Sequence, residues 1–320
     1  MGFDRNTASD EAFGHKPVLL DECLDALHIR PDGIYVDGTL GRAGHSLEIV
    51  KRLTTGRLFC LDRDETAIAA AKVRLADYMD RVTLVHSNFS RLGDVLAEQG
   101  VAGVDGMLFD LGVSSPQLDE ARRGFSYMHD APLDMRMDQT AALTARDVVN
   151  DWSYEDLRRI LFEYGEERYA PAIAKAIVKR RQESPIETTG QLVDIIRAAM
   201  PPAALREKQH PAKRTFQAIR IAVNDELGEL PPMLQAASQL LAPGGRLAVI
   251  SFHSLEDRII KKTLQELSTG CTCPPNFPVC VCGKKPKMKL VTRKPIVAGA
   301  AELVYNPRAR SAKLRVAEKI

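Results

Sequence analysis

One stretch decides the fold of this chain: Asp32-Gly33-Ile34-Tyr35-Val36-Asp37-Gly38-Thr39-Leu40-Gly41-Arg42-Ala43-Gly44-His45-Ser46. It begins with a turn signal, continues as a short apolar run and ends in a glycine-rich loop. A helical pattern follows from Leu47 to Leu53. The order strand, glycine loop, helix indicates a ligand site at the loop. Glycine permits positive φ and close approach to the main chain, and the start of a helix has unpaired N–H groups.

The loop differs from the common nucleotide-binding loops. Gly38, Gly41 and Gly44 have the spacing G-x-x-G-x-x-G, whereas the dinucleotide fingerprint is G-x-G-x-x-G and a Walker loop ends in Lys-Ser/Thr. Asp37 stands directly before the glycines and favours a ligand with positive charge. S-adenosyl-L-methionine carries both an ammonium and a sulfonium, so it is a suitable ligand. A tight turn without a ligand is the alternative interpretation of the loop alone.

Acidic residues close three of the predicted strands, at Asp37, Asp62 and Asp110. Because parallel strands have their carboxyl ends at one edge of a sheet, we expect these side chains to converge there. Asp62 stands one βα unit after the loop, where an acidic residue typically binds ribose hydroxyls. Phe89 follows the next predicted strand, where a ring can either pack on an adenine or simply fill the core.

The alternation of predicted strands and helices is interrupted once, after Gln117, by irregular segments and three helical patterns. It resumes with an apolar run at 241–251, which predicts a further strand. We therefore predict an α/β fold, a sheet domain with an all-helical insertion. The expected parts are a flexible N-terminal tail (1–14), the first part of the sheet domain (15–116), the helical insertion (117–212) and the second part of the sheet domain (213–320), with a cysteine-rich basic loop near 271–294.

The composition is ordinary for a soluble globular protein, with 45% hydrophobic and 27% charged residues in a chain of 320. The net charge is only +2, so a nucleic-acid partner must be argued from local basic clusters, which occur at 175–181, 206–214 and 284–294. No apolar run is long enough to span a bilayer, and the polar N-terminus lacks the features of a signal peptide. We expect a cytoplasmic protein with no membrane partner.

Four of the six cysteines are close in sequence: Cys271, Cys273, Cys280 and Cys282. In a cytoplasmic protein such a cluster indicates a metal before disulfides, and four thiolates can hold zinc in a tetrahedron. Paired zinc ligands usually have at least two residues between them, whereas one residue separates each pair here. A structural zinc site and a reduced loop without metal both remain open, and no catalytic metal is expected.

Six strings in the chain resemble one known family in order and spacing, from about His15 to Glu318. They are Asp37-Gly-Thr-Leu-Gly-Arg-Ala-Gly-His45-Ser46, Phe109-Asp-Leu-Gly-Val-Ser-Ser-Pro-Gln117, Pro132-Leu-Asp-Met-Arg-Met137, Tyr164-Gly-Glu-Glu-Arg168, Ser251-Phe-His-Ser-Leu-Glu-Asp-Arg258 and Asn306-Pro-Arg-Ala-Arg-Ser311. Together they resemble the ribosomal RNA small subunit methyltransferase H family. The resemblance implies a class I (Rossmann-like) S-adenosylmethionine-dependent methyltransferase sheet with a helical insertion that binds RNA.

The activity that the resemblance implies is methylation of the N4 amine of one cytidine in the decoding region of bacterial 16S rRNA, in the small ribosomal subunit. A homodimer is left open. The matching positions imply cofactor contacts at Ala43, Gly44, His45, Asp62, Phe89, Asp110 and Gln117, with Asp37 added by the charge argument above. Ala43 departs from a glycine that is common in the family, and binding through the backbone should survive the small methyl group.

The catalytic residues are less well defined. The N4 lone pair of cytosine is delocalised into the ring, so transfer needs in-line positioning and an acceptor for the amine hydrogens. Many amino-methyltransferases use an Asp/Ser-Pro-Pro-aromatic motif, which is absent here, so we hypothesise that Asp110, Ser114 or a main-chain carbonyl of 110–115 is the acceptor. His253, which follows a predicted strand at the same edge, is a second candidate. A histidine that is hydrogen-bonded in a turn is its more ordinary interpretation.

Two functions of other classes remain compatible with parts of the pattern. A nicotinamide-dependent Rossmann oxidoreductase has the same order of strand, glycine loop, helix and acid, but the glycine spacing argues against it. A non-catalytic RNA-binding protein would explain the basic clusters, but Asp37, Asp62 and Asp110 are intact in this sequence.

Overall fold

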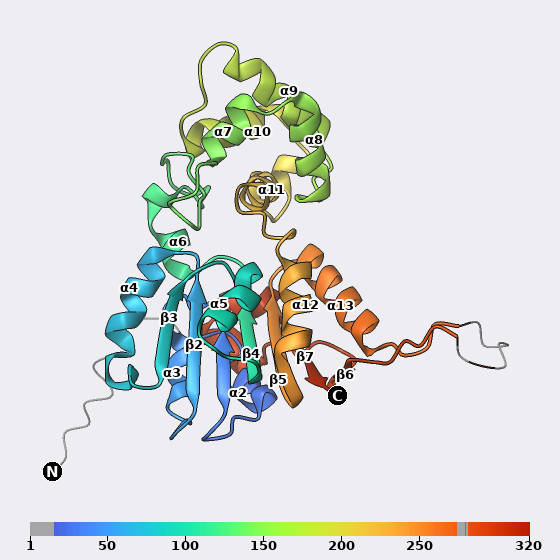
Figure 1. The fold of residues 1–320 in the computed structure, drawn as a ribbon. Coiled ribbons are helices and arrows are strands. Elements are labelled where there is room, and N and C mark those ends of the chain that lie inside the picture. Colours follow the sequence, from blue (N-terminus) through green and yellow to red (C-terminus); the bar gives the residue numbers. More distant parts are fainter. Residues whose placement is uncertain (1–15, 274–278, 280) are drawn as a thin grey trace. The chain divides into compact units, whose positions relative to one another are not determined.

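The computed structural model describes residues 16–273, 279 and 281–320. The tail predicted at 1–14 and Cys280 lie outside the described residues. The chain forms two compact units, one made of residues up to Gly112 together with Leu227–Ile320, and the other made of Val113–Glu226 (Figure 1). The first contains the sheet and the second is helical.

The first unit is built on a seven-stranded sheet with the order β3-β2-β1-β4-β5-β7-β6. Its parallel strands are β1 (Ile34–Asp37), β2 (Arg57–Asp62), β3 (Val82–His86), β4 (Val104–Asp110) and β5 (Leu241–Ser251). At the far edge, β7 (Lys313–Lys319) runs antiparallel to β5, and β6 (Met288–Leu290) runs antiparallel to β7. The strand order reverses between β1 and β4, which is the switch point at which open α/β sheets bind ligands. The predicted α/β sheet is confirmed.

Helices cover both faces of this sheet, as the alternation along β2 shows. Leu58 and Cys60 belong to one core cluster, whereas Phe59 and Leu61 belong to another, because successive side chains of a strand point to opposite faces. A strand that is buried on both faces reads as a continuous apolar run. The helices of this unit are α2 (Leu20–Leu27), α3 (Gly44–Val50), α4 (Glu65–Arg74), α5 (Leu92–Glu98), α12 (Leu230–Leu240), α13 (Ser254–Ser268) and α14 (Ala300–Tyr305).

The second unit has a single apolar core of its own. Its helices are α6 (Ser115–Asp119), α7 (Ala145–Asp151), α8 (Tyr154–Glu163), α9 (Ala170–Arg181), α10 (Thr189–Ala199) and α11 (Lys213–Asn224). The boundary predicted at 212 falls one helix too early. Phe216 and Ile219 of α11 are buried in the helical core, so the unit continues to Glu226.

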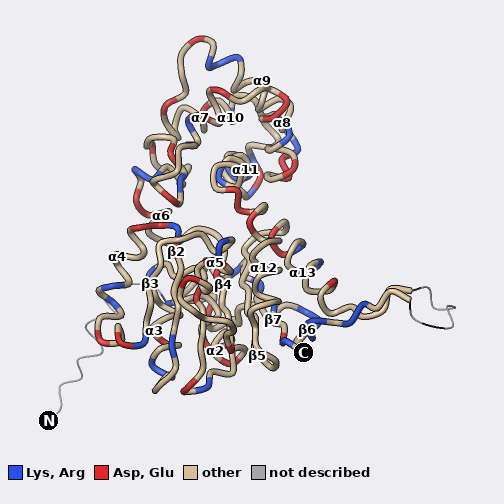
Figure 2. Tube along the Cα trace, viewed as in Figure 1, with Lys and Arg blue, Asp and Glu red and all other residues tan. Residues whose placement is uncertain are grey.

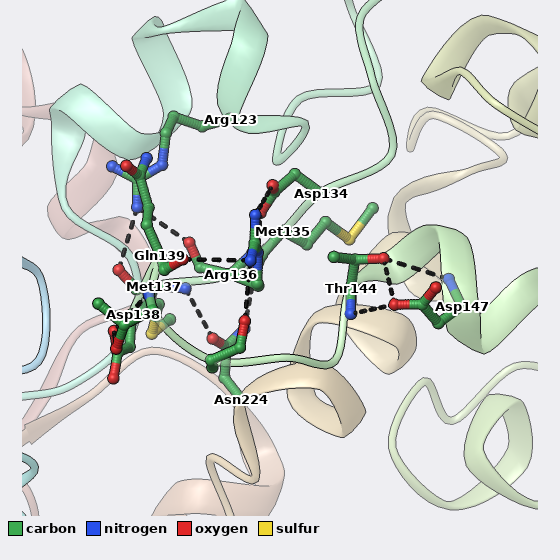
Figure 3. Close-up of polar contacts among 12 residues, drawn as sticks. Arg123, Asp134, Met135, Arg136, Met137, Asp138, Gln139, Thr144, Asp147 and Asn224 are labelled. Carbon is green, nitrogen blue, oxygen red and sulfur yellow. Dashed lines mark hydrogen bonds and ion pairs between the residues drawn. The ribbon is translucent and has the colours of Figure 1, made fainter.

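An irregular segment of the helical unit is fixed by side-chain hydrogen bonds to its backbone (Figure 3). The Asn224 side chain accepts from the N–H of Met137 at 2.8 Å and donates to the carbonyl of Met135 at 2.8 Å. Arg123 donates to the carbonyls of Arg136 and Met137. These contacts satisfy buried backbone groups that have no helix or sheet partner.

None of the described helices is both long enough and apolar enough to cross a membrane.

Candidate cofactor site

The acid at the end of β1 holds the glycine loop in its conformation. Asp37 accepts a hydrogen bond from the Ser46 hydroxyl at 2.6 Å and another from the N–H of Thr39 at 3.1 Å, so it joins the two ends of the loop. Its side chain is buried, and burial raises the pKa of Asp37 to about 6. Asp37 therefore shapes the loop from beneath and adds negative charge to the site.

The acid at the end of β2 fixes the middle of the same loop. Asp62 accepts from the N–H of Gly41 and from the N–H of Asp64, both at 2.8 Å. Gly41 has a φ of 50°, in the left-handed region that glycine adopts at little cost. Each carboxylate oxygen has a second lone pair, so Asp62 keeps acceptors for the two hydroxyls of a ribose. Burial raises the pKa of Asp62 to about 6.

Asp110, at the end of β4, is the least satisfied acid of the three. No residue within the described ranges donates a hydrogen bond to its buried Oδ1, and one quarter of the side chain is exposed. Burial, together with the carboxylates of Asp37 and Glu256, raises the pKa of Asp110 to about 8. A buried oxygen without a hydrogen-bond donor, next to two other acids, costs free energy. A cationic ligand offsets this cost.

His45, at the start of α3, packs beside Asp110 as a neutral ring. Its Nε2 lies 3.0 Å from the carbonyl oxygen of Val18, which can only accept, so Nε2 carries the proton and Nδ1 keeps a lone pair. That Nδ1 lies 3.8 Å from Asp110 Oδ2. Burial lowers the pKa of His45 to about 4, so this pair is not an ion pair at neutral pH.

The sheet register brings the three acids to one edge, as predicted. Asp37 lies opposite Cys60 on β2 and opposite Leu108 on β4. Asp62 and Asp110 each follow these partners by two residues and therefore end beside Asp37 at the carboxyl edge. Their influence on one another's pKa agrees with this placement, because the Asp62 carboxylate raises the pKa of Asp37.

Phe89 begins the turn after β3, and its surroundings include residues that the sequence did not single out. The Phe89 ring meets the Phe109 ring edge-on, with centroids 5.9 Å apart, and the Arg63 guanidinium lies 5.6 Å from the Phe89 centroid. Arg63 and Asn88 both bind the carboxylate of Glu229, which comes from the second sequence segment of this unit. The only feature of the sequence that could have indicated Arg63 and Asn88 is that they adjoin candidate residues, since Arg63 follows Asp62 and Asn88 precedes Phe89.

Ala43 and Gly44 form the tight corner between the loop and α3. Ala43 has a φ of 57°, which an L-residue adopts at a cost and which explains why glycine suits this position. A Cβ on Gly44 would lie 2.5 Å from Cγ of Pro17. The corner thus needs one residue that tolerates left-handed φ and another without a side chain.

The remaining candidates have structural roles in the described contacts. His253 is the N-cap of α13, and its Nδ1 accepts from the N–H of Glu256, so it has a structural contact, while a part in catalysis stays a prediction. Ser114 is the N-cap of α6, and its N–H donates to the side chain of Gln117 at 3.0 Å. Ser114 and Gln117 belong to the helical unit, so their contact with a cofactor stays a prediction.

A sequence model of the MraW methylase family matches residues 12–320. This chain belongs to the MraW methylase family. Among its relatives, a ribosomal RNA small subunit methyltransferase H from Brevibacillus brevis is 57% identical, with 97% of this chain and 99% of the relative covered. The protein of that name from Heliobacterium modesticaldum is 59% identical, with 96% and 99% covered.

Membership in the MraW methylase family makes this chain an S-adenosylmethionine-dependent methyltransferase, and the acidic edge of the sheet as its cofactor site stays a prediction. The residues present fit that cofactor, because Asp110 Oδ1 has no hydrogen-bond donor in the described part of the chain and can face a cation, and because Asp62 retains acceptors for hydroxyls. A nicotinamide oxidoreductase and a non-catalytic RNA-binding protein are not favoured.

Proposed function

We propose that this MraW methylase transfers a methyl group from S-adenosylmethionine to the N4 amine of one cytidine in the decoding region of 16S rRNA, in small ribosomal subunits in the cytoplasm. The relatives supply the substrate class through their printed names. The observation that carries the chemistry is the Asp110 carboxyl, which ends β4 with one oxygen unpartnered among the described residues.

In this proposal each strand end holds one part of the cofactor. The Asp62 oxygens accept hydrogen bonds from the ribose hydroxyls, as acids after the second strand of such sheets do. Phe89 packs on the adenine, and the glycine loop with Asp37 beneath it surrounds the methionine portion. When bound, S-adenosylmethionine supplies an electrophilic methyl group on its sulfonium.

Asp110 has the properties that the amine acceptor needs. A cytosine N4 attacks poorly until its hydrogens interact with a base, and a carboxylate whose pKa is raised toward neutrality is a stronger base than an ordinary one. Asp110 Oδ1 accepts a hydrogen of the amine and holds the proton that leaves N4. His45 packs beside the other oxygen as a neutral ring, which keeps a competing positive charge away from this carboxyl.

The helical unit supplies the RNA contacts in this proposal. A pocket within this unit is lined by Arg168, His210 and Arg214, together with Tyr169 and other residues. The ring of His210, which lines this pocket, stacks on the ring of Tyr127, with centroids 4.5 Å apart and planes 10° from parallel. Cations beside stacked rings suit phosphates and unstacked bases. Figure 2 shows further Lys and Arg along α8 and α9.

The test begins with small subunits from cells that lack this protein. We expect mass spectrometry of their 16S rRNA to show loss of one N4-methylcytidine, and the purified protein to restore it with S-adenosylmethionine. Binding to these subunits should weaken steeply with added salt, because phosphate contacts release counterions. An unchanged rRNA mass spectrum would contradict the proposed substrate.

Asp110→Asn tests the catalytic part, with Asp105→Asn as the matched control. Asp105 lies toward the other end of β4 and binds Arg30. We expect Asp110→Asn to reduce methyl transfer at saturating cofactor by about a hundredfold, within the range typical of a lost general base, and Asp105→Asn to keep it. Full turnover by Asp110→Asn would exclude Asp110 as the acceptor.

A further inference from the structure

Three cysteine thiols gather on the loop between α13 and β6, in the sheet-containing unit. The sulfur atoms of Cys271, Cys273 and Cys282 all lie within 4.8 Å of one another. Cys271 and Cys273 are separated by a single residue in sequence, and their sulfur atoms nevertheless lie within this distance of each other. The one-residue spacing that is unusual for zinc ligands is therefore compatible with two thiols that face one point.

The separation of two of these sulfurs matches that of ligands around a zinc ion. Cys271 Sγ and Cys282 Sγ lie 3.8 Å apart, and the Cys282 thiol donates a hydrogen bond to Cys271 Sγ. A tetrahedral zinc with Zn–S bonds of about 2.3 Å places its sulfur ligands about 3.8 Å from one another. A disulfide would bring the sulfurs to about 2.05 Å. The pair thus has the spacing of two ligands that share a metal.

Backbone N–H groups point at the same sulfurs. The N–H of Thr272 donates to Cys282 Sγ at 3.5 Å, and the N–H of Cys273 donates to Cys271 Sγ at 3.4 Å. Outer hydrogen-bond partners of this kind orient the ligands of a metal ion. Gly283 has a φ of 60°, so the chain turns sharply directly after Cys282.

The segment directly after the cysteine trio is strongly basic. Lys284, Lys285 and Lys287 follow Cys282 in sequence. Figure 2 shows this basic segment leading into β6. The N–H of Lys287 donates to the carbonyl of Leu267 at 2.8 Å, which joins the segment to the end of α13.

We propose that Cys271, Cys273 and Cys282 bind one zinc ion as thiolates, with a fourth ligand from outside this trio. The ion is structural, because it ties the two ends of the loop together and positions the basic segment 284–289. Metal binding releases the three thiol protons and makes the loop resistant to unfolding. The proposed methyl transfer does not use this ion, so failure of either proposal leaves the other standing.

Metal content tests the proposal on the full chain, purified under reducing conditions without chelator. We expect about one zinc per chain in the wild type and loss of most of it in Cys271→Ser and in Cys282→Ser. Thr272→Ala is the control, since it lies between two ligands and keeps all thiols and the backbone N–H. Wild-type protein without zinc after incubation with ZnCl₂, or unchanged zinc in both serine variants, would overturn the site.

Two further measurements separate metal binding from general folding. Cobalt added to the metal-free protein should give intense thiolate-to-cobalt charge-transfer absorption in the wild type and in Thr272→Ala, but weaker absorption in Cys271→Ser. Protease cleavage within the loop should become faster when zinc is removed, while affinity for S-adenosylmethionine stays unchanged. Mass spectrometry that found a Cys271–Cys282 disulfide in protein from reducing cytosol would also reject the zinc site.

Discussion

The sheet-containing unit and the helical unit obtain their polar geometry in different ways. In the first, Asp37, Asp62 and Asp110 come together because they end neighbouring strands, so the register alone places them. In the second, the segment around Met135 and Met137 is held by Asn224, which lies 87 positions from Met137 in sequence. The comparison shows that a regular sheet places its site residues by local pattern, whereas an irregular segment depends on distant side chains.

The two units also differ in what their buried polar groups do. Asn224 makes hydrogen bonds with both its amide nitrogen and its oxygen, so its contribution is stability. Asp110 is left with one oxygen unpartnered among the described residues and with a raised pKa. A buried polar atom without a hydrogen-bond partner is typical of a binding or catalytic group, because a bound ligand supplies the missing hydrogen bond.

The largest effect should come from Gly38→Val, which tests how rigid the sheet-containing unit is at its loop. A Cβ on Gly38 would lie 2.1 Å from Cε1 of the buried Phe109. We expect the free energy of unfolding to fall by more than about 3 kcal/mol, because overpacking in this core forces the backbone to move. Denaturant unfolding measures it.

Gly93→Ala is the control for that experiment. Gly93 lies in α5, and no described atom approaches within 4 Å of the Cβ that alanine would add. It should gain up to about 1 kcal/mol through helix propensity. Equal stability of Gly38→Val and wild type would show that the loop adapts freely.

Asn224→Ala should have the next largest effect and should be confined to the helical unit. It leaves the buried N–H of Met137 without its acceptor and the carbonyl of Met135 without its donor. We expect a loss of about 2–3 kcal/mol, the cost of orphaned buried groups, with unchanged affinity for S-adenosylmethionine. Calorimetric binding and unfolding measured together test this, and a large loss of cofactor affinity would mean that the two units are energetically coupled.

The pH dependence of cofactor affinity tests the raised pKa of Asp110. A cationic ligand favours the ionised carboxylate, so affinity should rise with pH toward the pKa of about 8, by at most about tenfold per pH unit for one proton. The ligand-free protein should respond oppositely. Its folded state holds a proton that the unfolded chain has lost, so its stability should fall as pH rises from about 5 to 8.

Asp110→Asn is the comparison that isolates this carboxyl. The ammonium of the cofactor titrates identically with both proteins, so only the contribution of Asp110 differs between their affinity profiles. We expect the variant to bind more weakly at pH 8 and to lose most of the rise between pH 6 and 8. Parallel profiles for the two proteins would refute the assignment of the raised pKa to Asp110.

The smallest effect should come from Ala43→Gly at the loop corner. Ala43 has a φ of 57°, where an L-residue pays about 1–2 kcal/mol that glycine avoids, although glycine loses more chain entropy on folding. We expect stability to rise by less than about 1 kcal/mol, with cofactor affinity unchanged. A drop in stability would show that the alanine methyl contributes more packing than strain.

Much of the sheet-containing unit could be predicted because its signals are local. Apolar runs that end in an acid gave the strands and placed Asp37, Asp62 and Asp110 at one edge. The limits of the helical unit were predicted less accurately, because α11 has an amphipathic pattern that fits either unit. Only its burial against the other helices assigns it. The contact of Arg63 with Glu229, 166 positions apart, had no sequence signal.

The amino-acid sequence by itself determined the order of strand, glycine loop and helix, and the edge at which the acids lie. Both follow from residue periodicity over a few positions. Tertiary structure decided which acid forms hydrogen bonds within the glycine loop and which one keeps an oxygen available for a ligand. Asp37 is enclosed by its own loop, whereas Asp110 is partly exposed beside Glu256 and His45, without a donor for Oδ1 among the described residues. Desolvation and hydrogen-bond partners depend on residues that folding brings together, and no local pattern encodes them.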